Sequence, residues 1–142
     1  MSFDLRIESN DLVIGATGDV DIVQDNAKLA QEIIKGILTP VGANRFHRWY
    51  GSAISARTVG QIMDPTILEM EAQRSVEDLL NNLIKLQKVQ AREQYLSPGE
   101  TIASVKEIFV IRNVSDPRQY EVHISVITRQ LTEVNETFQL RL

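Results

Sequence analysis

The residues that could perform acid–base chemistry occur in pairs that are too close in sequence to work together. Glu69 and Glu71, and Glu77 with Asp78, would have to serve as the two carboxyl groups of a glycoside hydrolase. Residues one or two positions apart in a helix point to different sides, and both pairs lie in a segment with helical periodicity. We therefore expect these acids to form a solvated helix face, and we expect no catalytic residue.

The remaining chemistry-bearing residues also lack partners. His47 and His123 are far apart, and the loop around His47 contains no acidic residue that could complete a metal site. Ser52 and Ser55 have no His and Asp at a recognisable spacing. The segment GATGD (residues 15–19) lacks the Lys-Ser/Thr ending of a phosphate-binding loop. The sequence therefore predicts no metal site and no cofactor, and it favours a protein that is not an enzyme.

One stretch, LTPVGANRFHRWYGSAI (residues 38–54), is unusually rich in aromatic and cationic residues and contains the chain's only Trp. Trp, Tyr and Arg dominate binding hot spots, and Arg forms bidentate pairs with carboxylates. One interpretation is a protein interface. The other is that the aromatic residues cap the core while the arginines lie in solvent. The residues of the candidate interface are Arg45, Phe46, Arg48, Trp49 and Tyr50. We also expect Gly51 to permit a turn that a side chain would obstruct.

Two helices are expected on either side of this stretch. In the first, AKLAQEIIKGILT follows two N-cap candidates, Asp25 and Asn26, and ends at Pro40. Its apolar residues share one stripe: Leu29, Ala30, Ile33, Ile34, Ile37 and Leu38. The second helix begins at Asp64-Pro65, an N-cap followed by proline at the first helical position. It is the longest expected element and ends within residues 88–94.

After Ser97-Pro98-Gly99 the periodicity changes from helical to strand-like. Residues 103–113, 119–129 and 133–142 predict three consecutive strands with short connections, which favour an antiparallel meander. At the N-terminus, FDLRIE alternates and predicts a half-buried strand with Phe3, Leu5 and Ile7 on its buried side. The expected fold class is α+β, with two main helices packed on a small antiparallel sheet and a C-terminal β-meander.

The composition limits the organisation and the partners. A chain of 142 residues fits a single domain, residues 1–142, with a sizeable core. The net charge of −4 argues against a nucleic-acid partner, which needs a basic surface. No apolar run is long enough to span a membrane, and no secretory signal is visible. The absence of Cys excludes disulfides and thiolate sites.

The order of these elements and the residues around the first loop resemble the baseplate wedge family of contractile-tailed phages, the small lysozyme-like sheath-initiator proteins. Relatives of this family serve in type VI secretion and other contractile injection machines. The matching residues are Gln31, Leu38, Thr39, Gly42, Arg45, Tyr50, Gly51 and Ser52. The family's Gly-Glu-Arg becomes Gly42-Ala43-Asn44-Arg45 here. Its Glu-Pro-Arg motif after the second helix is not intact in residues 91–101.

The resemblance implies a structural subunit of a contractile tail baseplate that binds wedge proteins and initiates tail-sheath assembly. It further implies a hetero-oligomeric, six-fold assembly, located in the virion tail baseplate and in the host cytoplasm during assembly. Two alternatives stay open. One is an enzyme, which the lysozyme-like label invites. The other is a soluble regulatory protein-binding module, because a bacterial anti-adaptor resembles the same fold.

The last predicted strand reaches the final residue without Pro or Gly to blunt its edge. Within the resemblance, sheath subunits are linked by exchanged strands. We therefore expect the meander to take up a strand of the tail sheath protein by β-augmentation. Phe138, Leu140 and Leu142 complete the candidate interface. The alternative is that this strand only completes the protein's own sheet.

Overall fold

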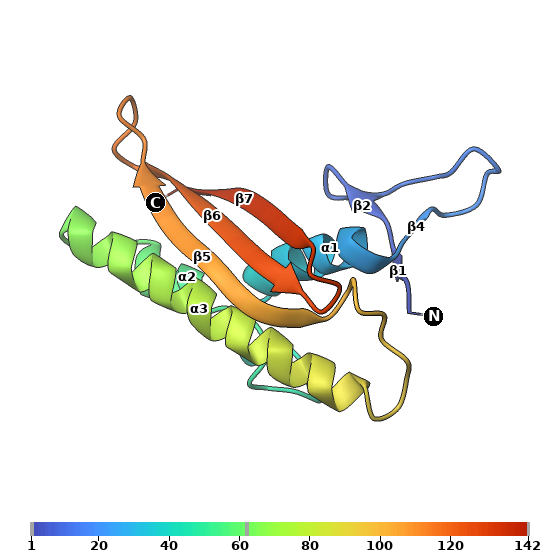
Figure 1. Cartoon of the computed structure of the whole chain (residues 1–142). Helices are drawn as coiled ribbons and strands as arrows, with labels where there is room; N and C mark the ends of the chain where they lie inside the picture. Colours follow the sequence, from blue (N-terminus) through green and yellow to red (C-terminus); the bar gives the residue numbers. More distant parts are fainter. Residues whose placement is uncertain (1, 62, 142) are drawn as a thin grey trace.

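The computed structural model describes residues 2–61 and 63–141 and has the predicted α+β architecture (Figure 1). Two main helices pack on an antiparallel sheet: α3 lies below β5 in Figure 1, and α1 contacts β7. A short helix, α2, lies against α3. The elements are β1 (Asp4–Leu5), β2 (Ile7–Glu8), β3 (Asp11–Leu12), β4 (Ile22–Val23), α1 (Asp25–Leu38), α2 (Ile54–Thr58), α3 (Pro65–Gln90), β5 (Ile102–Arg112), β6 (Gln119–Thr128) and β7 (Glu133–Arg141).

The N-terminal residues 2–23, here called the N-terminal arm, do not form the predicted half-buried strand. The arm folds back on itself, so that β1 pairs with β4 and β2 pairs with β3, and it projects away from the sheet (Figure 1). Phe3, Leu5 and Ile7 are exposed. The alternation is present, but α1 meets the arm through the polar Gln31, whose amide bonds to the backbone of Leu5 and Ile7. The prediction of a buried face was therefore wrong.

Helix α1 contains most of the predicted stripe but starts differently. Leu29 and Ile33 are fully buried, whereas Leu38 is exposed at the end of the helix and does not belong to the stripe. The N-cap is Gln24, which makes no side-chain capping bond. Asp25 and Asn26 were predicted as N-caps, and this was wrong. Their carboxylate and amide oxygens instead accept hydrogen bonds from the hydroxyl groups of Ser97 and Thr132.

Helix α3 begins where the sequence predicts and ends within the predicted range. The Asp64 carboxylate accepts a hydrogen bond from the backbone N–H of Thr66 (2.9 Å), and Pro65 occupies the first turn. This satisfies one of the free N–H groups of the helix start. Its buried stripe carries Leu68, Ala72, Val76, Leu79, Leu80 and Leu83.

The strands β5, β6 and β7 form the predicted meander, in the order β5-β6-β7. The side of β6 that faces the helices carries Tyr120, Val122, Ile124 and Val126, all buried. The pairing of β6 with β7 is regular from Gln119–Arg141 to Ile127–Glu133. The pairing of β5 with β6 contains two irregularities, near residues 103 and 106. Both β5 and β7 are edge strands among the described residues, but only β7 has a regular edge.

Candidate protein interface

The stretch between α1 and α3 is a loop closed by a tight neck. The backbone N–H of Ser52 donates to the carbonyl of Thr39 (2.8 Å), and the N–H of Val41 donates to the carbonyl of Ser52 (3.3 Å). Gly51 lies in this neck with φ +116°, and a Cβ there would lie 2.5 Å from the Thr39 oxygen. Only glycine fits such a position without backbone movement. The predicted reason for Gly51 is confirmed.

Between the two sides of the neck, the loop makes a turn that the Asn44 side chain holds. The Asn44 side-chain oxygen accepts hydrogen bonds from the backbone N–H groups of Phe46 (3.0 Å) and His47 (3.1 Å). The N–H of Tyr50 then donates to the carbonyl of His47 (2.9 Å). As a result, the Phe46 side chain is 90% exposed. A phenyl ring in water without packing is unfavourable for the isolated chain, which is the arrangement expected of a contact residue.

The two other aromatic residues of the loop are half-buried and support it. The Lys85 ammonium lies 4.3 Å from the centroid of the Trp49 ring, and the His47 ring lies beside it. The Asn82 amide donates to the Trp49 carbonyl (3.0 Å), which ties the loop to α3. Tyr50 packs against the core. Burial, with a smaller contribution from the charge of nearby Glu32, raises the pKa of the Tyr50 hydroxyl.

The predicted interface residues therefore occupy three kinds of position. Arg45, Phe46 and Arg48 are exposed, and Trp49 and Tyr50 are half-buried. On β7, Phe138 packs against the core and Leu140 is buried within it, so these side chains contribute to the protein's own sheet. Leu142 lies outside the described residues. The part of β7 that stays unpaired among the described residues is its outer backbone edge.

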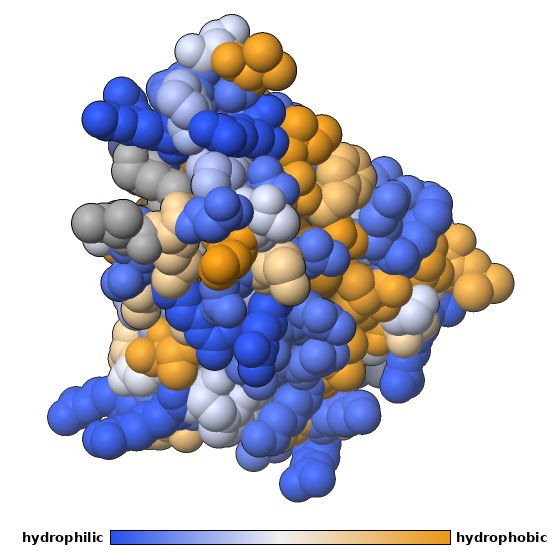
Figure 2. Space-filling model, turned by 90° about the vertical axis from the view of Figure 1, so that its left-hand side faces the viewer, coloured by the Kyte–Doolittle hydropathy of each residue, from blue (hydrophilic) through white to orange (hydrophobic). Residues whose placement is uncertain are grey.

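Further exposed apolar residues lie where α3 begins and where β5 turns into β6. Ile67 and Met70 on α3 and Val114 in the turn are exposed. Figure 2 looks at this side of the molecule and shows hydrophobic residues at several separate places between hydrophilic ones. These residues belong neither to the loop nor to β7, and no sequence pattern predicts them because single exposed apolar residues are common.

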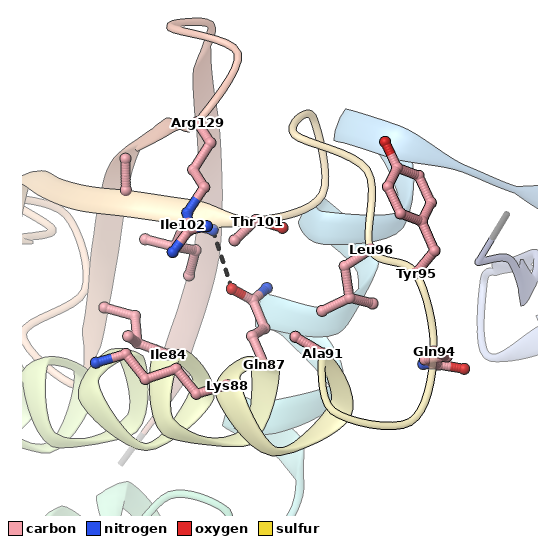
Figure 3. Close-up of a pocket in the computed structure, with 11 residues that line it drawn as sticks. Ile84, Gln87, Lys88, Ala91, Gln94, Tyr95, Leu96, Thr101, Ile102 and Arg129 are labelled. Carbon is pink, nitrogen blue, oxygen red and sulfur yellow. Dashed lines mark hydrogen bonds between the residues drawn. The ribbon is translucent and has the colours of Figure 1, made fainter.

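A cavity of about 510 Å³ separates the end of α3 from the start of β5 (Figure 3). Gln87 closes its inner wall: the side-chain amide donates to the Glu100 carbonyl (2.8 Å) and accepts from the Ile102 N–H (3.0 Å). Both bonds satisfy backbone groups that burial would otherwise leave unpaired. Gln87 therefore has a structural role, which sequence reasoning missed.

A buried ion cluster joins α1 to the segment before β5. The Lys28 ammonium lies 2.8 Å from Glu32 and 2.9 Å from Glu100, and both Lys28 and Glu100 are almost fully buried. Burial alone would lower the pKa of Lys28, but its hydrogen bonds to the two carboxylates outweigh burial and raise the pKa. Glu100 lies in the segment, residues 91–101, where the Glu-Pro-Arg motif of the sheath-initiator family is not intact. In this protein its side chain contacts Lys28.

The acids considered for catalysis are distributed along α3. Glu77 and Asp78 are exposed, as predicted for a solvated face, and Asp78 pairs with Arg57 (3.2 Å). Glu69 and Glu71 are half-buried, so the prediction of a solvated face was wrong for these two acids. Across residues 2–61 and 63–141, no cluster of three or more His, Asp or Glu residues could hold a metal ion. In the same residues, no helix is long and apolar enough to cross a membrane.

Comparison with known proteins gives a likeness of fold. Neither the protein-family models nor the sequences of curated proteins match this chain. Among solved structures, the chain is similar to a protein of Geobacter sulfurreducens described as a "putative tail lysozyme". The two share 15% sequence identity with a TM-score of 0.57, over 80% of this chain and 87% of the other. At this identity the likeness establishes a shared fold.

Proposed function

We propose that this chain is a structural subunit of a contractile tail baseplate that binds wedge proteins and initiates assembly of the tail sheath. The observation that carries the proposal is the fold shared, over four-fifths of the chain, with a protein described as a tail lysozyme. The residues of the first loop that resemble the sheath-initiator family agree with it. Fold alone does not fix function, so two surfaces supply the rest of the argument.

The first surface is the loop at residues 38–54, which contacts wedge proteins in this proposal. It combines a rigid neck, an exposed Phe46 and the exposed cations Arg45 and Arg48. Preorganised aromatic and Arg side chains give affinity at a low entropy cost. Arg45 is the first choice for an anchoring contact, to a carboxylate supplied by the partner.

The second surface is the free edge of β7, which takes up a strand of the tail sheath protein. Its pairing with β6 is regular along its length, so its outer N–H and C=O groups can continue the sheet. The complete assembly is hetero-oligomeric and six-fold. It lies in the virion tail baseplate, after assembly in the host cytoplasm.

The proposed subunit is not a hydrolase, although the Geobacter protein carries a lysozyme name. Glycoside hydrolysis needs two carboxyl groups facing one another across a sugar. The acids of α3 offer no such arrangement that we recognise: Asp78 pairs with Arg57, and Glu77 points into solvent.

Removal of the gene from its phage or injection system, followed by electron microscopy of the particles, tests the proposal. The expected particles contain baseplate and tube but no sheath, and the chain supplied in trans restores the sheath. Sheathed tails of normal length without the chain would contradict the proposal. A chain that is absent from purified tails and copurifies with one regulatory protein would favour the anti-adaptor alternative.

A further inference from the structure

A groove of about 680 Å³ lies between α1 and the N-terminal arm, and Glu136 of β7 reaches it. Its surface on α1 is mostly apolar and includes the small residues Ala27 and Ala30. The facing surface of the arm is mixed: it contributes the apolar Ile7, Ile22 and Val23 and the polar Arg6, Glu8, Ser9 and Asn10. The groove therefore lies beside the free edge of β7, on the side of the sheet that faces the helices.

The groove exists because the arm is held by polar contacts at one end. Gln31 bonds to the arm backbone, and the Lys35 ammonium contacts the Asp4 carboxylate (2.7 Å). The apolar side chains of the arm do not fill the space over α1: Ile7 and Ile22 are each more than 40% exposed. The apolar side chains of α1 and the arm that stay open to water favour an occupant.

Glu136 is the unusual residue at this edge. It occupies the core-facing side of β7, in alternation with Val134 and Phe138, where an apolar side chain would be expected. It is half-buried, and burial raises the pKa of its carboxyl group.

The other charged residues of the groove have partners. Arg6 pairs with Glu8 and Asp21, and Lys35 pairs with Asp4. Glu136 has no ion-pair partner among the described residues. An inward-facing charge on an edge strand normally prevents pairing with foreign strands. It admits a strand that supplies the opposite charge, because that strand removes the cost of an unpaired carboxylate.

We infer that the groove receives the inward-facing side chains of the sheath-protein strand that extends the sheet at β7, and that Glu136 selects a Lys or Arg on that strand. The inference rests on the proposed function for the identity of the partner. It adds the edge, the side-chain pattern and the selecting residue. The strand carries apolar residues at alternate positions to fill the groove, and one basic residue replaces an apolar residue opposite Glu136.

Edge β5 is the poorer acceptor. Its ladder with β6 is interrupted near residues 103 and 106, and such bulges discourage further pairing. The groove also borders β7 and not β5. Both observations place the incoming strand on β7.

Synthetic peptides and the full chain test the inference directly. Each peptide has nine residues, the length of β7, with Val at alternate positions, Thr between them, and either Lys or Glu at the central Val position. Isothermal titration should show that the native chain binds the Lys peptide about tenfold more tightly than the Glu peptide. Glu136→Gln, which preserves shape, should remove the preference, and Glu136→Lys should reverse it.

The matched control is Glu133→Lys, the same charge change on the same strand but on the opposite face of the sheet. It should leave the preference unchanged. Equal affinity of the native chain for both peptides, or the same loss of preference in the control, would overturn the inference.

Purified sheath protein separates the two proposals. Normal sheath nucleation by a chain that shows no peptide preference would overturn the inference and leave the proposed function intact. Selection of the Lys peptide by a chain that binds no sheath protein would support charge selection by Glu136 and overturn the proposed function.

Discussion

At the scale of single residues, Phe46 is the cleanest probe of the loop. Its side chain is 90% exposed, so Phe46→Ala should change the free energy of unfolding by less than about 0.5 kcal/mol. If the loop contacts a wedge protein, the same change should weaken binding by about 2 kcal/mol, the effect of a hot-spot residue. Urea unfolding and titration with the wedge partner measure the two quantities.

Val114→Ala is the matched control, because Val114 is a fully exposed apolar residue outside the loop. This substitution should leave the affinity for the wedge protein unchanged. Unaltered binding of Phe46→Ala would argue against the interface. Trp49→Ala is less informative, since Trp49 contacts Lys85 and packs on α3. Its loss would weaken folding and binding together.

Gly51 sets the shape of the neck. Gly51→Ala should lower the free energy of unfolding by about 2 kcal/mol or more, because a Cβ would meet the Thr39 oxygen and φ is positive. Gly42 also has positive φ, but open space surrounds its Cβ position, so Gly42→Ala should cost less. Urea unfolding of both variants isolates the contact with Thr39. Equal losses would show that backbone strain alone is responsible.

The residues that sequence reasoning could predict were those with local signals. Gly51 follows Tyr50 at the end of a loop, and this local sequence predicts a turn that requires glycine. Lys28 and Gln87 had no such signal, because Glu100 lies far along the chain from Lys28 and the partners of Gln87 are backbone groups. A polar residue on a helix is normally assigned to the surface, and only the fold shows that Lys28 and Gln87 are buried.

At the scale of elements, the Lys28 cluster joins α1 to the segment before β5 and should make the free energy of unfolding depend on pH in the alkaline range. A raised Lys pKa contributes stability that is complete below the unfolded value of about 10.4 and is lost as pH rises through the folded value. We therefore expect the free energy of unfolding to fall above about pH 10.4. In Lys28→Met the fall should be smaller, although that variant is less stable by about 3 kcal/mol at neutral pH.

Urea unfolding between pH 8 and 11 checks this dependence. Lys88→Met is the control, since Lys88 is exposed on α3 and should keep the native pH profile. If the free energy of unfolding of Lys28→Met falls with pH as steeply as that of the native chain, the cluster is not the cause of the loss of stability at alkaline pH.

Periodicity predicted the main elements well and their environments less well. The stripes of α1 and α3 and the alternation of β6 identify faces that the structure buries. The N-terminal alternation identifies a face that nothing covers, because periodicity states which side chains lie together and not what packs on them. Asp25 and Asn26 were misassigned for a related reason: their oxygens bond to Ser97 and Thr132, contacts that no local pattern reveals.

At the scale of the whole molecule, the proposal distinguishes an assembly protein from a hydrolase. Purified protein should not turn over peptidoglycan, because no pair of facing carboxyl groups is recognisable among the acids of α3. Release of soluble fragments from labelled cell wall measures this activity, with a known lysozyme as positive control. Turnover that a single Glu→Gln change abolishes would contradict the prediction.

The strand β7 also determines which experiments can address sheath initiation. Val134 and Leu140 are buried in the core, so deletion of residues 134–142 should unfold the protein rather than remove only an interface. The central claim is therefore best tested on the intact chain.

Hydrogen exchange at single-residue resolution, with and without purified sheath protein, tests that claim most directly. If β7 takes up a strand, amides of residues 133–141 that do not bond to β6 should exchange much more slowly in the complex. Exchange along the free edge of β5 should be unchanged. Sheath protein that assembles on the chain without slowing exchange in β7, or that protects only β5, would contradict the account.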